Sequence, residues 1–237
     1  MQKINNIQFV LTDIEGTTTS ISFVVDVLFP YFKQHFQSFV DEYFSEKFIK
    51  DNFELVKKTI KEEENIELND LQVIEKLLYW VDIDRKHFAL KNLQGLVWKL
   101  GYEKGDLKGH IYSDVVANLI KWHQNKITLG IYSSGSVTAQ KLLFGSSIEG
   151  DLTHYFSYYF DTQIGGKREI TAYENILKEI QNKISISPNN ILFLSDIEQE
   201  LDAAKANGFQ TLQLVRGETL PSQKHQIVRS FDEIVLL

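Results

Sequence analysis

The sequence predicts an α/β protein in which a parallel sheet forms the core and a helical segment is inserted near the start of the chain. Three observations favour this class. Residues 8–12 form an apolar run typical of a buried strand. From residue 106 onward, helical and strand-like segments alternate, which predicts parallel strands joined by right-handed crossovers. Between these parts, residues 21–105 carry apolar side chains at helical spacing.

The predicted domains follow from this change of pattern. Residues 1–20 and 106–237 are expected to form a Rossmann-like α/β core, and residues 21–105 an inserted α-helical cap. Helical spacing within the cap is clearest at residues 23–29, 36–44 and 71–80. The expected order in the core is helix 114–122, strand 127–132, helix 137–144, a short strand around 158–160, helix 170–180, strand 191–194, helix 198–207 and strand 211–215. The glycine- and lysine-rich segment 101–109 is expected to be a hinge.

Composition and charge narrow the function classes. The chain has 237 residues, and 43% of them are hydrophobic, which is enough for a sizeable core. Cysteine is absent, so a disulfide framework, a thiolate metal site and a cysteine nucleophile are excluded. With 32 acidic and 25 basic residues the formal charge is -7, which disfavours nucleic acid and anionic membranes as partners. A phosphate site would therefore need local attraction from a cation, a lysine or backbone amides.

The amino-terminal residues and the hydropathy of the chain predict a soluble intracellular protein. The first six residues lack the apolar segment of a signal peptide. No later run approaches the ~18 apolar residues of a membrane span. The expected location is the cytoplasm, and also the nucleus if the host is a eukaryote.

The first candidate site lies directly after the first predicted strand. Asp13 and Glu15 stand two positions apart, so both carboxylates can address one reacting group. Gly16 permits a sharp bend, and Thr17 and Thr18 can hydrogen-bond back to brace the turn. Ligands of open α/β sheets bind at the carboxyl ends of strands, which favours a catalytic interpretation. The alternative is an ordinary acidic turn braced by threonines.

Two further stretches suit the binding of a phosphoryl group. Ser133 and Ser134 follow a predicted strand and precede a helix, where hydroxyls and free amides can hold phosphoryl oxygens. The alternative for the stretch 131–136 is a serine N-cap with a glycine turn. Lys167 follows a strand and two glycines, as Lys141 and Lys183 do not, and is therefore the candidate cation.

The fourth stretch supplies carboxylates at another strand end. With Asp13, the acidic residues Asp196 and Glu200 could serve a hard divalent cation such as Mg²⁺, which prefers carboxylate, carbonyl, water and phosphate oxygens. The alternative is an acidic helix start favoured by the helix dipole. Four suitable residue types at four strand ends of one sheet edge are much less expected by accident than any one of them.

Taken together, these motifs resemble the haloacid dehalogenase-like phosphatases and, within them, the enolase-phosphatases of methionine salvage, the acireductone synthases. The similarity covers nearly the whole chain, and Glu15 is informative because most phosphatases of the superfamily have Asp there. The segments that carry it are Asp13-Ile14-Glu15-Gly16-Thr17-Thr18, Leu93-Gln94-Gly95 with Trp98 and Gly101-Tyr102, Tyr132-Ser133-Ser134-Gly135-Ser136-Val137, Ala139-Gln140-Lys141-Leu142-Leu143-Phe144-Gly145, and Phe160-Asp161-Thr162 with Gly165 and Lys167. Two features depart from the family pattern: no proline follows Arg216, and Gly166 precedes Lys167.

The resemblance implies a mechanism and a metal. Asp13 would be the nucleophile that forms an aspartyl phosphate, and the Glu15 side chain would be the general acid and base. One Mg²⁺ ion would be held by the side chains of Asp13 and Asp196 and the main-chain carbonyl of Glu15.

The resemblance also implies roles for four further residues. Lys167, Ser133 and Ser134 would bind the phosphoryl oxygens. Glu200 would support the site from behind by orienting Lys167 or a metal-bound water.

The resemblance also supplies a substrate, 2,3-diketo-5-methylthiopentyl 1-phosphate, which would be enolised and then dephosphorylated to an acireductone. The helical insertion would close over the site and exclude water, and a monomer is expected, as in family members.

Several other functions compete with this interpretation. A general small-molecule phosphate-ester phosphatase of the same superfamily stays open, as does a non-catalytic binding protein on the same fold, which the intact acids and Lys167 disfavour. A carbon-halogen hydrolase needs no metal, so Asp196 and Glu200 argue against it. The sequence has no Gly-x4-Gly-Lys-Ser/Thr motif for a P-loop, and its six histidines show no paired spacing for zinc.

Overall fold

The computed structural model describes residues 1–237, which form two compact units. The core unit comprises Met1–Phe23 and Lys108–Leu237, and the helical unit comprises Val24–Leu107.

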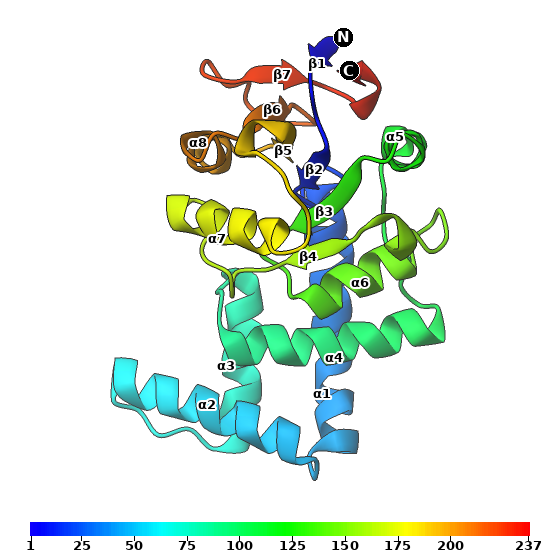
Figure 1. Cartoon of the computed structure of the whole chain (residues 1–237). Coiled ribbons are helices and arrows are strands. Elements are labelled where there is room, and N and C mark those ends of the chain that lie inside the picture. Colours follow the sequence, from blue (N-terminus) through cyan, green and yellow to red (C-terminus); the bar gives the residue numbers. More distant parts are fainter. The chain divides into compact units, whose positions relative to one another are not determined.

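A six-stranded parallel sheet organises the core unit, with strand order β4-β3-β2-β5-β6-β7 (Figure 1). The strands are β2 (Phe9–Thr12), β3 (Thr128–Tyr132), β4 (Tyr158–Phe160), β5 (Ile191–Ser195), β6 (Gln210–Leu214) and β7 (Gln226–Val228). The short, apolar β2 is buried throughout and pairs with β3 on one side and β5 on the other. Since all six strands run in parallel, their carboxyl ends lie along one edge.

Four helices connect the strands of this sheet. They are α5 (Ser113–Gln124), α6 (Val137–Gly145), α7 (Ile170–Gln181) and α8 (Glu198–Ala206). Figure 1 shows α7 and α8 on one side of the sheet and α5 and α6 on the other. The side facing α7 and α8 buries a cluster that includes Phe9, Leu11, Tyr132, Tyr173 and Phe193. Three-residue 3₁₀ turns occur at Thr153–Tyr155, Pro188–Asn190 and Phe231–Glu233.

The structure adds elements that the sequence pattern does not predict. A separate parallel pair joins β1 (Gln2–Ile4) to β8 (Ile234–Leu236), and β7 extends the main sheet. Each of these strands has only three residues, too few to show a periodicity of two. Their partners lie far away in the chain, so local pattern carries little information about them.

The helical unit contains a π-helical entry at Phe23–Leu28, whose first residue belongs to the core unit, and four α-helices. These are α1 (Phe29–Tyr43), α2 (Lys47–Glu64), α3 (Asp70–Asp82) and α4 (Phe88–Lys104). Their apolar faces share one core, built around large side chains such as Phe32, Phe36, Phe53 and Trp80. The unit thus has its own hydrophobic core, as a separately packed body requires.

The ends of these helices show one correction to the predicted hinge. Residues 101–104 are the last turn of α4, so only the remainder of segment 101–109 is free of regular helix. Gly105 ends α4 with φ of +81°, a conformation that favours glycine. The glycines therefore mark a helix end as well as a connection between units.

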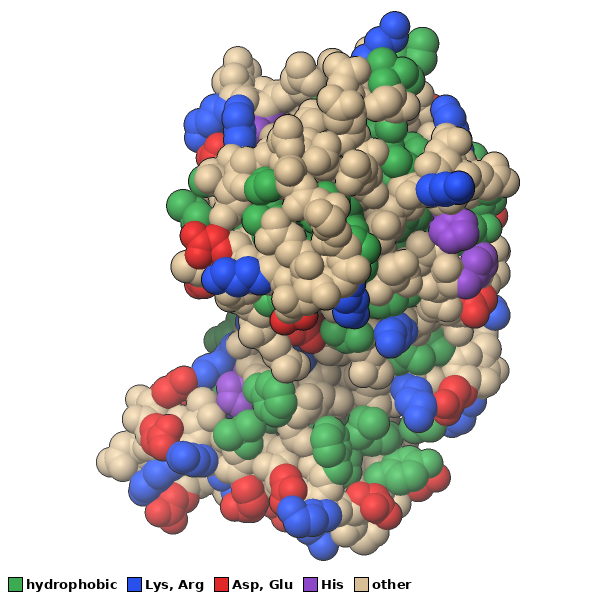
Figure 2. Space-filling model, viewed as in Figure 1, with side chains coloured by type: hydrophobic (Ala, Val, Ile, Leu, Met, Phe, Trp, Pro, Cys, Tyr) green, Lys and Arg blue, Asp and Glu red, His purple; other side chains and the backbone are tan.

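The next features are the distribution of charged side chains on the surface and the apolar character of the helices. On the face drawn in Figure 2, basic and acidic side chains are interspersed without a broad basic area. None of the helices combines the length and the apolar character that crossing a membrane requires.

Candidate active site

The loop after β2 is held in one shape by its own backbone. Asp13 N–H donates to the Leu194 carbonyl at 2.8 Å, which continues the pairing of β2 with β5. The N–H groups of Thr17, Thr18 and Thr19 all point to the Ile14 carbonyl, at 3.1, 2.9 and 2.9 Å. The Thr17 and Thr18 hydroxyls also donate within the loop, so the predicted bracing by threonines is present.

Asp13 and Lys167 form a buried ion pair at the end of β2. The Lys167 ammonium contacts Asp13 Oδ1 and lies 2.8 Å from Glu200 Oε2. Asp13 is 2% exposed, and Lys167 and Glu200 are also buried. The Ser195 hydroxyl donates to the same Glu200 oxygen at 2.8 Å, which fixes that carboxylate. The structure thus brings together three of the predicted site residues from separate segments of the chain.

Glu15 and Ser133 meet on the neighbouring strand end. The Ser133 hydroxyl donates to Glu15 Oε2 at 3.1 Å, so the loops after β2 and β3 are linked by side chains. Ser133 is buried, whereas Glu15 is partly exposed and remains accessible. The N-cap of α6 is Ser136, whose hydroxyl accepts from Ala139 N–H at 3.2 Å. The serine N-cap that this stretch could supply is therefore present, at Ser136, and Ser133 and Ser134 precede it.

Asp196 approaches the first loop from the end of β5. Gly16 has φ of +75°, and a Cβ built on it would lie 2.5 Å from Asp196 Oδ2. Only glycine therefore leaves room for this carboxylate beside the loop. The Asp196 carbonyl accepts from Gln213 Nε2 at 2.8 Å, which anchors the residue from its other side.

The electrostatics of the cluster are unbalanced. Burial raises the pKa of Asp13 well above its ordinary value, Lys167 opposes that shift, and the surrounding carboxylates add to it. Burial and Glu200 raise the pKa of Asp196 to about 6. Burial alone would lower the pKa of Lys167, but Asp13 and Glu200 prevail and raise it, so the lysine stays charged. One ammonium group therefore contacts Asp13 and Glu200, while the charges of Glu15 and Asp196 also act on Asp13.

This surplus of buried negative charge suits a divalent cation. A buried carboxylate without enough positive partners is costly, and a metal ion would supply the missing charge. No group of three or more His, Cys, Asp or Glu side chains is arranged to hold a metal by itself. The set expected from the sequence has only two carboxylate side chains, Asp13 and Asp196, together with the Glu15 carbonyl. Its hard oxygen donors fit a magnesium-type ion.

Arg216 and Asp114 join the site loop to its support, and they were missed as a pair from the sequence. Arg216 Nε donates to the Thr17 carbonyl at 3.0 Å, and its guanidinium pairs with both Asp114 oxygens, at 3.0 and 2.6 Å. Asp114 also accepts from Ser230 and from the Phe231 amide. The two residues are 102 positions apart, and each resembles an ordinary surface charge when taken alone.

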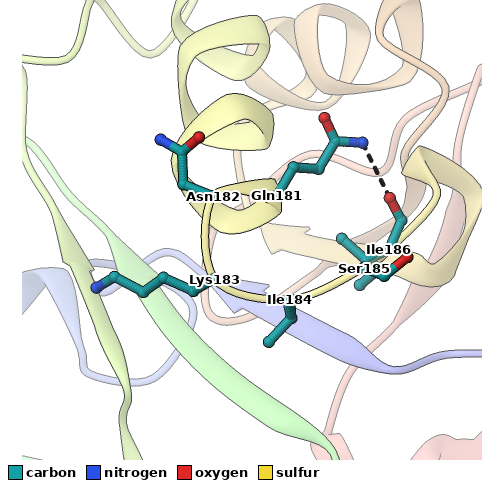
Figure 3. A pocket seen from close by; sticks show the side chains of 6 residues that line it. All are labelled: Gln181, Asn182, Lys183, Ile184, Ser185 and Ile186. Atoms are coloured by element: carbon teal, nitrogen blue, oxygen red, sulfur yellow. Dashed lines mark hydrogen bonds between the residues drawn. The ribbon is translucent and has the colours of Figure 1, made fainter.

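The competing lysines lie outside this cluster. A pocket of about 350 Å³ lies at the end of α7. It is lined by residues 181–186, whose side chains are drawn in Figure 3. It contains Lys183, whose ammonium lies 5.0 Å from the Tyr158 ring centre. The Lys141 ammonium lies 5.2 Å from the Tyr159 ring centre. None of the predicted site residues lines this pocket, and neither lysine has an ion pair with Asp13 or Glu200.

The chain is similar to proteins of a known family. A family model described as a haloacid dehalogenase-like hydrolase matches residues 7–208. The enolase-phosphatase E1 of Citrobacter koseri is 47% identical over 228 residues, with 96% of each chain covered. That of a Picosynechococcus species is 48% identical over 231 residues, which cover 98% of this chain and 99% of the relative.

Solved structures agree with the sequence comparisons. The UTR4 protein of Saccharomyces cerevisiae superposes with a TM-score of 0.77 at 36% identity, covering 96% of this chain and 99% of the other. CbbY of Rhodobacter sphaeroides, solved with phosphate, gives a TM-score of 0.61 at 14% identity over 96% of each chain, which shows a shared fold. The chain belongs to the enolase-phosphatase E1 family of the haloacid dehalogenase-like hydrolases.

Proposed function

We propose that this chain enolises 2,3-diketo-5-methylthiopentyl 1-phosphate and then removes its phosphate to give the acireductone of methionine salvage. The observation that carries the proposal is the buried Lys167 bridging Asp13 and Glu200, beside the Glu15–Ser133 contact. This cluster of carboxylates around one cation at the sheet edge supports a site for phosphoryl transfer. Near-full-length similarity to enolase-phosphatases supports the choice of substrate.

Asp13 is the proposed nucleophile. Its carboxylate attacks phosphorus, the bond from phosphorus to the ester oxygen breaks, and an aspartyl phosphate forms that water then hydrolyses. The loop hydrogen bonds to Ile14 and the Lys167 contact hold this carboxylate in place before the substrate arrives. Positioning of this kind accounts for much of phosphoryl-transfer catalysis.

Lys167, Ser133 and Ser134 are the proposed phosphate-binding residues. The Lys167 ammonium offers the positive charge that an anionic group needs in this acidic protein. Glu200 accepts from both Lys167 and Ser195 and so keeps the ammonium directed at the Asp13 end of the site. Charge that develops on the phosphoryl oxygens in the transition state is stabilised there.

Glu15 is the proposed acid and base. Its partly exposed side chain is oriented by the Ser133 hydroxyl and can protonate the leaving oxygen, then accept a proton from the attacking water. Such a group contributes typically ~10² to 10⁴ in rate.

A single Mg²⁺ ion is the proposed metal, held by Asp13, Asp196 and the Glu15 carbonyl. When bound it would offset the repulsion between the Asp13 carboxylate and the phosphate and would polarise a phosphoryl oxygen. The proposed cap is the helical unit, which would exclude water from the reaction. A cytoplasmic monomer completes the proposal.

The direct test is to incubate the protein with the diketone phosphate and Mg²⁺ and to follow enolisation and phosphate release separately. Asp13→Asn and EDTA should each abolish phosphate release. Asp151→Asn is a matched control, because this carboxylate lies on the exposed connection before β4 and accepts from Thr153 instead. Release of phosphate from many simple esters without enolisation would contradict the specific substrate and favour a general phosphatase.

A further inference from the structure

Lys167 lies in a glycine-containing connection that its own sequence stiffens only in part. The segment between β4 and α7 contains the adjacent residues Gly165 and Gly166. Gly165 has φ of +139°, which side-chain-bearing residues rarely adopt. Two neighbouring glycines allow a backbone many conformations, yet the Lys167 ammonium must meet the Asp13 and Glu200 carboxylates. Hydrogen bonds within the loop, from Gly165 N–H to the Thr162 carbonyl and from Glu169 N–H to the Gly166 carbonyl, restrict this path in part, and contacts from outside the loop restrict it further.

Two tyrosine hydroxyls hold the loop at the positions that flank Gly166. Tyr132, the last residue of β3, donates to the Gly165 carbonyl at 2.8 Å. Tyr173, in the first turn of α7, donates to the Lys167 carbonyl at 2.8 Å. Both distances are those of well-formed hydrogen bonds. The backbone of the lysine is thus tied to a strand on one side and to a helix on the other.

The two rings are themselves immobilised by packing. Both tyrosines are fully buried, and their rings meet edge to face with centres 5.6 Å apart. Tyr173 also packs against Phe193 at 5.3 Å and Phe209 at 6.1 Å between ring centres. A hydroxyl on a ring fixed in this way has little freedom, so it can fix its acceptor in turn.

Packing alone does not explain why these residues carry hydroxyl groups. The same buried cluster accepts Phe9 and Phe193, so phenylalanine would satisfy its apolar surroundings. Burial raises the pKa of both tyrosines, and both therefore stay protonated as donors over the whole physiological range. The contacts that use the hydroxyls are the two loop carbonyls.

We propose that Tyr132 and Tyr173 are positioning residues that clamp the Gly165–Lys167 backbone and so present the Lys167 ammonium to the phosphoryl group. The role rests on the proposed function of Lys167 and adds two residues to the reaction without direct contact to substrate. It also explains how a loop with a glycine before Lys167 keeps one path, because the two hydroxyls restrict the freedom that the glycine gives the backbone.

The test compares Tyr132→Phe, Tyr173→Phe and the double variant in the full-length protein. The matched control is Tyr159→Phe on β4, because the Tyr159 hydroxyl also donates to a backbone carbonyl, that of Thr153 at 3.1 Å, outside the site. For each protein, kcat and KM for phosphate release are measured, together with the dissociation constant of inorganic phosphate by calorimetry in Mg²⁺ and the thermal midpoint.

Loss of one neutral hydrogen bond should lower kcat about threefold in each single variant. The double variant should lose at least about thirtyfold, more than the product of the singles, because one remaining bond still holds the loop. Its phosphate affinity should fall about tenfold, and kcat should fall more than KM rises, since Lys167 acts most on transition-state charge. Tyr159→Phe should lower the thermal midpoint to a similar extent, with kinetics within about twofold of wild type.

Two results would overturn the clamp. One is a double variant with kcat and phosphate affinity within about twofold of wild type. The other is an equal kinetic loss in Tyr159→Phe, which would show a general effect of stability. A wild-type protein that releases no phosphate would instead contradict the proposed function, and phosphate binding by calorimetry would still report on the clamp.

Discussion

The Asp13–Lys167 pair is buried in the core unit and the Asp114–Arg216 pair is largely buried there, but their surroundings differ in charge balance. Lys167 pairs with the carboxylates of Asp13 and Glu200, and burial together with the acidic neighbours Glu200, Glu15 and Asp196 raises the pKa of Asp13. Arg216 faces one carboxylate with bidentate geometry, and that carboxylate has two further donors. Burial opposes ionisation of Asp114, but hydrogen bonds from Arg216 and the Phe231 amide lower its pKa below the ordinary value.

The Asp13–Lys167 cluster therefore has negative charge without a matching cation, whereas the charges of the Asp114–Arg216 pair balance each other. In a satisfied ion pair each charge already has its partner, and removal of one partner leaves the other charge uncompensated. A buried cluster with surplus charge is costly to the free protein, and it binds a cation or changes protonation to remove that cost. The contrast predicts that variants of the first pair affect chemistry most, and variants of the second affect stability most.

Lys167→Met should have the largest effect on activity. We expect kcat/KM for phosphate release to fall about 10²- to 10³-fold, the range seen when one group that stabilises transition-state charge is removed. Arg216→Met should lower kcat/KM less than about tenfold, because its link to the site is one hydrogen bond to the Thr17 carbonyl. Lys183→Met, which removes a lysine outside the cluster, is the control and should be unchanged. Equal losses for Lys167→Met and Arg216→Met would remove the distinction between the two pairs.

Asp114→Asn should have the largest effect on stability. The change leaves the Arg216 guanidinium, only 9% exposed, without its charged partner. Breaking one side of such a buried pair costs about 3 kcal/mol of unfolding free energy. Urea denaturation followed by circular dichroism measures this loss. A loss below about 0.5 kcal/mol, the range of ordinary surface substitutions, would show that the pair is not structural.

The sequence could predict most of the site because parallel sheets obey a simple rule. Residues that follow β2, β3 and β5 must lie at one edge, so Asp13, Ser133 and Asp196 are brought together by topology alone. Lys167 could be chosen among the lysines because glycines precede it. No pattern, however, states that its ammonium bridges Asp13 and Glu200, since that depends on side-chain packing.

The missing parts are those that local pattern cannot encode. Asp114 and Arg216 belong to different elements, and only the folded chain shows that they pair around the Thr17 carbonyl. Strands β1 and β8 pair the two ends of the chain over three residues each. In the predicted hinge 101–109, the glycines suggested an irregular segment, but residues 101–104 pack as the end of α4. Tertiary packing decided these cases against local propensity.

Mg²⁺ should stabilise the folded protein by binding beside the Asp13–Lys167 pair, and it should not affect the Asp114–Arg216 pair. At a concentration 100-fold above its dissociation constant, the ion should add about 2.7 kcal/mol to the folded state, seen as a higher thermal midpoint. Asp196→Asn should abolish most of this shift, because it removes one of the two expected carboxylate ligands. Asp114→Asn should have a lower thermal midpoint without Mg²⁺, but Mg²⁺ should raise that midpoint as much as it does in wild type. An unchanged shift in Asp196→Asn would place the metal elsewhere.

The Asp114–Arg216 pair should also affect how the stability of the protein depends on pH. The pKa of Asp114 is lowered in the folded protein from an ordinary value of 3.8, so its ionised form stabilises the fold above that pH. This contribution is lost as pH falls through the lower, folded-state pKa. Asp114→Asn carries no such group, and its stability deficit relative to wild type should stay constant between pH 7 and about 5, then shrink below about pH 4. Parallel urea titrations of the two proteins at each pH measure the difference. A deficit that persists unchanged to pH 3 would show that the Asp114 charge does not contribute, and that the variant loses stability through packing alone.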